Sequence, residues 1–336
     1  MGYSATSRDE LDARNAYRRA THTSFAHTST MASTPVALRT CHPSVDPQVT
    51  NSAGQKIREC LDSAAHPRSK ALVTGFDETG SMGEAPHILQ SKLAALKGSL
   101  LRAGLPDIQV CFSAYGDGQN DEVAPCQVGQ FESGLEMEDQ LNNLYLEGMG
   151  GGNAGETSGL LLYFLACYSR LDSLDKRGEK GYLILTGDEC PLPVITREEV
   201  SRYIGTDIPN DLSIEEVVAR ITKLYDVYFF HYMTGAARMQ NSLPVWQRLL
   251  GTDHVIPLEN LDTVTEQMVM LIASLEGITD TVEEAAALLV AEGADPSAVA
   301  RAGQAMVPFT RARSPQAKVT GNLPTPAAPS SRIRRL

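Results

Sequence analysis

Short apolar runs alternate with segments of helical periodicity from about residue 70 to residue 278. The runs "KALV", "IQVCF", "YLIL", "VYFF" and "VIPL" are predicted to be strands. Within them, "ALV" and "YLIL" are continuous rather than alternating, which is typical of strands that are buried on both faces. Between the first two runs, the segment "APHILQSKLAALKGSLLRAG" places apolar residues at steps of three and four before a terminal glycine. Strands that alternate with helices predict an α/β fold with a doubly wound, mostly parallel sheet flanked by helices, as in Rossmann-like folds.

Further helices are predicted by local signals at several places along the chain. Ser7 and Ser213 are each followed three residues later by a glutamate, and this spacing predicts a capping box at the start of a helix. Helical patterns also occur in "FESGLEMEDQLNNLYLEG", "SGLLLYFLACYSRL", "TREEVSRYI", "PVWQRLLG" and "LDTVTEQMVMLIASLE".

The composition divides the chain into four parts. Residues 1–66, rich in Ser, Thr, Ala, Arg and His, are expected to be largely irregular with short helices at "SRDELDARNAYRRA" and "SAGQKIRECLDSAA". Residues 67–278 form the predicted α/β domain, and residues 279–308 predict a helical hairpin, broken at "GADP", that packs as an appendage. Residues 309–336 are basic and rich in Pro and Ser, which predicts a disordered tail.

The charge distribution bears on the class of partner. The whole chain carries a net charge of −12, and the last 26 residues hold six basic side chains and no acid, so residues 1–310 carry −18. An acidic body argues against a nucleic-acid-binding face on the folded domain. The basic tail could contact an anionic partner, but a solvated tail is the favoured interpretation.

Other broad features restrict the location and the chemistry. No run of about 18 apolar residues occurs, so no membrane span is expected. The start "MGYSATSRDE" is too charged for a secretory signal, which favours a cytoplasmic location. Six scattered cysteines without CxxC spacing argue against a zinc site or a disulfide framework.

Polar side chains follow three predicted strands at the point where each strand ends. Asp77 ends the first strand in "FDETGSMG", Asp117 follows the second, and Asp188 follows "LILTG". Ligands of open α/β sheets bind outside the carboxyl ends of the strands. The sequence therefore predicts a site at this edge of the sheet.

The stretch "DETGS" has the composition of a metal loop. Asp77, Thr79 and Ser81 alternate and offer one carboxylate and two hydroxyls, which are hard oxygen ligands suited to Mg²⁺ or Mn²⁺. A helix N-cap is the alternative interpretation. Capping accounts for the hydroxyls, but it does not account for the preceding carboxylate or for the acids at the neighbouring strand ends.

The glycine-rich segment "GGGNAGET", residues 150–157, resembles a phosphate-binding loop in its spacing. It differs from GxxxxGK[ST] at one fixed position, where Glu156 stands in place of Lys. A glutamate there would repel the phosphates that the lysine attracts. Nucleotide binding by this loop is therefore not expected.

The stretch "VTGFDETGSMG" resembles the D-x-S/T-x-S motif of von Willebrand factor A-type (vWA) domains, the metal-ion-dependent adhesion site (MIDAS), in its bacterial or phage intracellular type. The resemblance covers roughly residues 68–278 and includes the glycine-rich second loop and "LILTGDE". It implies that a divalent ion is held, directly or through water, by Asp77, Thr79, Ser81 and Asp188.

The second loop departs from the family's pattern. Gly155 stands where the family supplies a Thr, so the missing oxygen would come from Asn153, Glu156 or Thr157. Two further acids lie at the strand ends. For Asp117 a solvated turn is expected rather than a role beside the ion, and for Glu189 a surface acid and a place in the surroundings of the ion are equally favoured.

The resemblance implies a non-enzymatic interaction module in which the ion bridges to an Asp or Glu of a partner protein. Intracellular members of this family often act with an ATPase of the AAA type or within regulatory assemblies. A metal-dependent phosphatase or hydrolase is an alternative, although "DETGS" lacks the second Asp of a DxD pair and no GxSxG elbow occurs. A structural subunit with a vestigial metal loop is a third hypothesis, which Gly155 favours.

Overall fold

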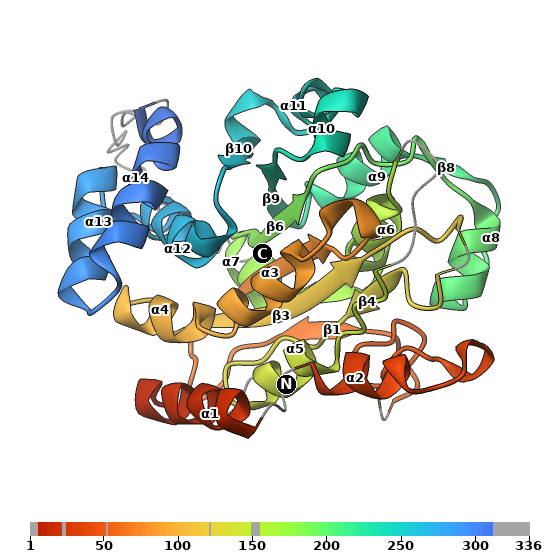
Figure 1. Cartoon of the computed structure of the whole chain (residues 1–336), viewed down its shortest axis with the longest axis horizontal. Coiled ribbons are helices and arrows are strands. Elements are labelled where there is room, and N and C mark those ends of the chain that lie inside the picture. Colours follow the sequence, from red (N-terminus) through yellow and green to blue (C-terminus); the bar gives the residue numbers. More distant parts are fainter. Residues whose placement is uncertain (1–5, 22–24, 52, 121, 149–154, 312–336) are drawn as a thin grey trace, which may run out of the picture.

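The computed structural model describes residues 6–21, 25–51, 53–120, 122–148 and 155–311. A six-stranded sheet in the order β10-β9-β6-β2-β3-β4 lies at its centre (Figure 1). All neighbouring strands run parallel except β4, which is antiparallel to β3. The strands are β2 (Lys70–Asp77), β3 (Ile108–Tyr115), β4 (Cys126–Val128), β6 (Gly181–Gly187), β9 (Tyr225–Tyr232) and β10 (Val255–Leu258). The predicted doubly wound, mostly parallel sheet is confirmed.

Successive side chains of the strands enter two separate cores, one on each face of the sheet. Leu72 and Phe76 of β2 enter the first core with α3 (Ala85–Leu93), α4 (Leu96–Arg102) and α12 (Val264–Leu275). Ala71 and Val73 enter the second core with α6 (Ser158–Tyr168), α9 (Ile214–Ile221) and α11 (Ser242–Leu250). Because helices cover both faces, both sets of side chains are apolar, which explains the continuous apolar runs.

The remaining described elements are short. They are η1 (Val36–Leu38), η2 (Gly80–Met82), α5 (Glu136–Asn143), α7 (Asp172–Arg177), β7 (Val194–Ile195), α8 (Arg197–Glu199), the π-helical η3 (Val200–Ile204), β8 (Leu212–Ser213), α10 (Gly235–Gln240), η4 (Thr252–His254) and η5 (Leu261–Thr263). The capping box predicted at Ser213 opens α9. The helix predicted as one piece after the metal loop is divided into α3 and α4.

The N-terminal part packs against the sheet domain. Helix α1 (Arg8–Thr21) begins with the predicted capping box at Ser7, and α2 (Ala26–Ala32) follows; they contact α4 and α5, respectively. The helix predicted at "SAGQKIRECLDSAA" is wrong. Residues of this segment form β1 (Arg58–Cys60), which pairs in parallel with β5 (Ser169–Leu171). In β1 the two end residues are buried and the middle one is half-buried, which is the period of a strand rather than that of a helix.

The C-terminal part contains two helices, α13 (Val282–Ala291) and α14 (Pro296–Arg311), where the sequence predicts a helical hairpin. Helix α14 packs against α12 and against the edge strand β10, and Figure 1 shows the blue helices together at one end. The helix continues through Pro308 to Arg311, and residues 312–336 lie outside the described part of the chain. The division into four units remains a prediction.

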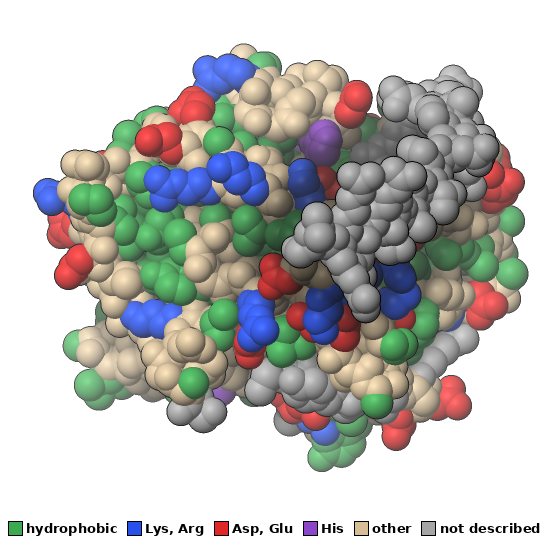
Figure 2. All heavy atoms as spheres, turned by 180° about the vertical axis from the view of Figure 1, so that it is seen from behind, with side chains coloured by type: hydrophobic (Ala, Val, Ile, Leu, Met, Phe, Trp, Pro, Cys, Tyr) green, Lys and Arg blue, Asp and Glu red, His purple; other side chains and the backbone are tan. Residues whose placement is uncertain are grey.

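The surface mixes side chains of both charges. In the rear view of Figure 2, acidic and basic side chains are interspersed over the part of this face that is not drawn in grey. Among the described helices, none is long and apolar enough to cross a membrane.

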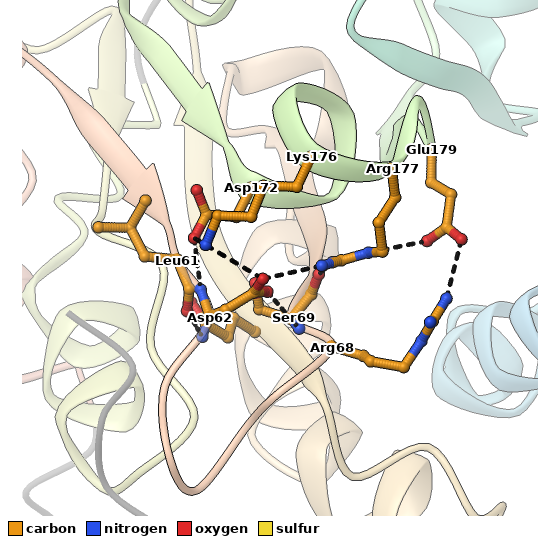
Figure 3. Close-up of polar contacts among 9 residues, drawn as sticks. Leu61, Asp62, Arg68, Ser69, Asp172, Lys176, Arg177 and Glu179 are labelled. Atoms are coloured by element: carbon orange, nitrogen blue, oxygen red, sulfur yellow. Dashed lines mark hydrogen bonds and ion pairs between the residues drawn. The ribbon is translucent and has the colours of Figure 1, made fainter. Parts of the chain in front are cut away.

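An ion-pair network joins the amino-terminal ends of β2 and β6 (Figure 3). Asp62 accepts hydrogen bonds from Arg177 Nη1 at 2.8 Å and from the backbone and hydroxyl of Ser69 at 3.0 and 2.8 Å. The Asp62 backbone N–H donates to Asp172 Oδ2 at 2.8 Å, and Lys176 donates to both carboxylates. Although burial acts to raise it, the donors from Arg177, Ser69 and Lys176 lower the pKa of Asp62 to about 2.

The Asp62→Asn variant is expected to lose about 1–2 kcal/mol of unfolding free energy at neutral pH. The folded-state pKa is depressed, so the stabilisation is present above the unfolded-state value near 4 and is lost as the pH falls toward 2. Chemical denaturation of wild type and variant, from pH 7 down to the lowest pH at which both are folded, measures the difference in their unfolding free energies. This difference should narrow below about pH 4. Asp175→Asn, which changes an exposed acid of α7, the helix that carries Lys176 and Arg177, is the matched control. A difference that is independent of pH would contradict this assignment.

Candidate functional site

The candidate site lies where the order of the sheet strands reverses. From β2 the chain continues to β3 on one side, and from β6 it continues to β9 and β10 on the other side. The loops after β2 and β6 therefore diverge and leave a crevice at the carboxyl ends of these strands. Asp77 is the last residue of β2, and Asp188 directly follows β6.

A chain of hydrogen bonds joins the four residues of the predicted metal loop. The Thr79 backbone N–H and hydroxyl both donate to Asp77 Oδ1, at 2.8 and 2.7 Å. The Thr79 hydroxyl lies 3.2 Å from Ser81 Oγ, and Ser81 Oγ donates to Asp188 Oδ1 at 3.1 Å. The structure thus brings Asp77, Thr79, Ser81 and Asp188 together, as the strand-end argument predicts.

The second carboxylate oxygen of Asp77 is buried and is not used in any hydrogen bond to the residues that the structure describes. Burial, followed by the nearby Asp188, raises the pKa of Asp77 well above its usual range. Close approach of β6 requires Gly187, because a Cβ atom there would lie 2.4 Å from the Tyr115 hydroxyl and 3.4 Å from Asp77 Oδ2. Asp77 Oδ2 is therefore a buried hydrogen-bond acceptor without a donor among the described residues. Burying it costs free energy unless a cation or a proton neutralises the carboxylate.

The second loop is fixed against the loop after β6. The Glu156 backbone exchanges hydrogen bonds with Cys190 and Leu192, each at 2.9 Å. One carboxylate oxygen of Glu156 is buried without a hydrogen-bond partner among the described residues, and burial and Asp77 raise its pKa strongly. Thr157 is engaged elsewhere, because its hydroxyl accepts from the Gly118 backbone N–H at 2.8 Å. Glu156 is therefore the better candidate of the two, and Asn153 lies outside the described residues.

The two further acids of the sequence analysis occupy different positions. Asp117 accepts from the backbone N–H of Gln119 at 3.0 Å and from the side chain of Asn120, so it forms a local turn. The expectation that this turn is solvated is wrong, since Asp117 is fully buried. Glu189 is also buried and accepts from Gln240 Nε2 at 2.6 Å, so it is not a surface acid.

The sequence analysis missed Thr234, which follows β9. Its hydroxyl donates to Asp188 Oδ2 and also accepts from the Ala237 backbone N–H at 3.1 Å, which caps α10. Both oxygens of Asp188 therefore have hydroxyl donors, Ser81 on one side and Thr234 on the other. The signal that could have identified Thr234 is its place after a buried strand, as for the three strand-end acids.

Helix α11 also holds the backbone of the loop after β6, which we call the third loop. Ser242 Oγ donates to the Asp188 carbonyl at 2.6 Å and contacts His231 Nε2 at 2.8 Å. The Trp246 indole N–H donates to the Glu189 carbonyl at 2.8 Å, while its ring stacks on Phe229 at a centroid distance of 4.0 Å. The position of Asp188 thus depends on Thr234 after β9 and on Ser242 and Trp246 of α11.

A second group of acids lies beside the crevice, and their carboxylates accept hydrogen bonds from backbone N–H groups. Glu78 accepts from the Glu147 N–H, Glu122 from the Asp117 N–H, and Glu147 from the Val123 N–H. Burial raises the pKa of Glu78 well above its usual range and that of Glu122 to about 7. These bonds order the loops after β2 and β3 around the Asp77 crevice.

The oxygen atoms at the crevice are suited to a small divalent cation only if the hydroxyls take part. Within the part of the chain that the structure describes, no three Asp, Glu, His or Cys side chains form a group that could hold a metal ion. Asp77 and Asp188 supply two carboxylates, and Thr79 and Ser81 supply two hydroxyls, which gives the hard oxygen set that Mg²⁺ prefers. No Lys, Arg or His of the described residues forms an ion pair with Asp77, Glu156 or Asp188. The unpaired oxygen of Asp77 and the set of two carboxylates and two hydroxyls therefore fit a cation.

Comparisons with known proteins identify no family. No protein-family model and no curated protein matches the chain. Similar solved structures include the pilus adhesin SpaC from Lactobacillus rhamnosus GG in its open conformation, with a TM-score of 0.45 and 14% identity over 63% of this chain and 30% of that chain. They also include the vWF domain of the type V pili tip protein Mfa5 from Porphyromonas gingivalis, with a TM-score of 0.40 and 11% identity over 63% of this chain and 96% of that chain. These likenesses are remote. The chain spans about 30% of the length of the pilus adhesin.

Proposed function

We propose that the chain is a vWA-like protein-interaction module whose crevice holds Mg²⁺ or Mn²⁺ through Asp77, Thr79, Ser81 and Asp188. The observation that carries this proposal is the buried, unpartnered oxygen of Asp77 beside two hydroxyls and a second carboxylate. A bound divalent ion supplies an electrophilic position that accepts a carboxylate oxygen from outside. Glu156 is the candidate from the second loop, since its carboxylate also has an unpartnered buried oxygen.

We propose binding rather than catalysis at this site. Hydrolysis at a metal site requires a positioned base or nucleophile. Among the described residues, no His, Lys or Cys side chain forms a hydrogen bond or ion pair with the four proposed ligands, whose side-chain partners here are Asp, Thr and Ser. Ser81 is the least buried of the four and marks the side from which a partner would approach.

The proposed partner is a protein that presents an Asp or Glu to the ion. The resemblance to intracellular vWA domains makes an AAA-type ATPase or a regulatory assembly the class of partner to test first. A cytoplasmic location is part of the same proposal. Nucleic acid is not proposed as a partner of the folded domain because residues 1–310 carry a net charge of −18.

Titration with Mg²⁺ or Mn²⁺ during thermal unfolding tests the proposal. An ion that binds only the native state raises the free energy of unfolding by about 2.7 kcal/mol at one hundred times its dissociation constant. The midpoint of wild type is expected to rise with the metal concentration, and that of Asp77→Ala is expected not to rise. Asp62→Asn, which removes a carboxylate at the opposite end of the sheet, should respond like wild type.

Two outcomes would overturn the proposal in different ways. A wild-type midpoint that does not respond to either metal would favour a structural subunit with a vestigial loop. Turnover of a generic phosphate ester that is lost in Asp77→Ala would favour the phosphatase alternative.

A further inference from the structure

An apolar groove lies between the edge strand β10, helix α11 and the end of α14. Its volume is about 490 Å³, and its apolar lining is formed by Met233, Leu243, Val255, Pro257, Pro308 and Phe309. Met233 is 42% exposed, so part of this apolar surface faces solvent among the described residues. Two acids, Asp253 and Glu259, also line the groove and are exposed.

The groove is suited to side chains rather than to an added strand. Strand β10 stands at the end of the sheet order, so its outer edge lacks a partner strand among the described residues. Pro257 lies in the middle of β10 and is exposed, and a proline has no N–H for a further strand. Apolar side chains that fill the groove would remove its lining from water.

The chain itself passes along this groove before it leaves the described part. Pro308 and Phe309 of α14 line the groove, α14 ends at Arg311, and 25 residues follow. A segment of this length extends over as much as about 80 Å, which is enough to return across the groove. Tethering at Arg311 gives it an effective concentration on the order of millimolar, so weak contacts suffice.

The charges of the groove and of the following segment are complementary. Residues 312–336 contain five basic side chains and no acid. Neither Asp253 nor Glu259 forms an ion pair with another described residue. The segment also carries apolar side chains close to its basic ones, with Val319 and Leu323 after Lys318.

We propose that residues 312–336 dock in this groove of their own chain. Val319 and Leu323 cover the apolar lining, and Arg313 and Lys318 lie near Asp253 and Glu259. None of the four proposed metal ligands lines the groove, so the docked segment does not have to contact the proposed metal. Docking buries the exposed part of Met233.

Photocrosslinking in the full-length protein tests this proposal. A benzophenone amino acid at position 323, in place of Leu323, is expected to crosslink within the same chain to residues 231–259, as mapped by mass spectrometry. The yield should fall several-fold in the double variant Asp253→Lys, Glu259→Lys, and it should also fall as the salt concentration is raised. The control Glu283→Lys, Glu292→Lys changes the net charge equally at exposed acids of the α13 region and should leave the yield unchanged.

Three results would overturn the proposal. Crosslinks that lie outside the groove, or a yield that is equal in both double variants, would show that the segment does not dock there. Crosslinks between two chains would assign the groove to a second copy instead. Circular dichroism of each variant verifies that it is folded, and repeating the assay with Mg²⁺ and with chelator separates this result from the proposed metal function.

Discussion

Asp77→Asn is expected to stabilise the metal-free protein and to be less stable than wild type once Mg²⁺ is present. Asn retains the acceptor that Thr79 uses, and it replaces the unpartnered carboxylate oxygen of Asp77 by a neutral amide group. Removing a buried, unpaired charge should raise the unfolding free energy by about 1–3 kcal/mol at neutral pH. The same change removes a charged ligand from the proposed metal site, so the added ion should stabilise only wild type.

The pH dependence of this effect has a defined sign. Burial and Asp188 raise the folded-state pKa of Asp77 above its unfolded value of about 4. The contribution of protonated Asp77 to the unfolding free energy of wild type is therefore fully present below about pH 4. It is lost as the pH rises toward the folded-state pKa. The advantage of Asp77→Asn over wild type should grow from about pH 4 upward, whereas the Asp62→Asn difference should narrow toward acid pH.

Thermal and denaturant unfolding of wild type and Asp77→Asn, in chelator and in Mg²⁺, measures both effects. The expected pattern is a crossing, with the variant more stable in chelator and wild type more stable in the metal. Equal responses of the two proteins to Mg²⁺ would remove Asp77 from the metal site. A variant that is less stable than wild type in chelator at every pH would show that the unpartnered oxygen is not a source of instability.

Trp246→Ala is expected to lower the unfolding free energy by about 3–5 kcal/mol, since it empties a fully buried aromatic site. Trp246→Phe keeps most of the stacking on Phe229 but leaves the Glu189 carbonyl without its donor. This smaller change should cost about 1–3 kcal/mol. It should also weaken Mg²⁺ binding, because Glu189 adjoins Asp188.

Denaturant unfolding followed by circular dichroism measures the stability of both variants, and the shift of the midpoint with Mg²⁺ measures the metal response. If Trp246→Phe binds the metal as wild type does, the indole N–H has no role in positioning the third loop. If both variants cost the same free energy, stacking on Phe229 contributes little.

The fold class follows from the sequence because strands covered on both faces carry apolar side chains on both faces, which gives continuous apolar runs. The same local argument fails for β1, whose three residues become a strand only by pairing with β5, about 110 positions later. It also fails for β4, a three-residue strand within a polar stretch that is placed by its antiparallel contact with β3. Both are set by contacts between distant segments, which no local pattern reveals.

The candidate site divides in a similar way. Asp77 and Asp188 are predictable because each ends a buried strand, and parallel strands place their carboxyl ends at one edge. Whether Glu156 or Thr157 is the better candidate ligand depends on how the second loop packs against Cys190 and Leu192. This packing cannot be predicted from the sequence. Thr234 follows the same strand-end rule as the acids, but a threonine without a neighbouring acid gave no chemical signal.

The contact between Trp246 and the third loop has a practical consequence for optical spectroscopy. Trp246 is the single tryptophan of the chain and is 1% exposed. Its indole N–H donates a hydrogen bond to the carbonyl of Glu189, the residue after Asp188. Indole emission responds to the polarity and hydrogen bonding of its surroundings, so the fluorescence of the folded protein reports on one loop. The chain therefore carries its own optical probe at the site where ion and partner are proposed to meet, and no label has to be attached.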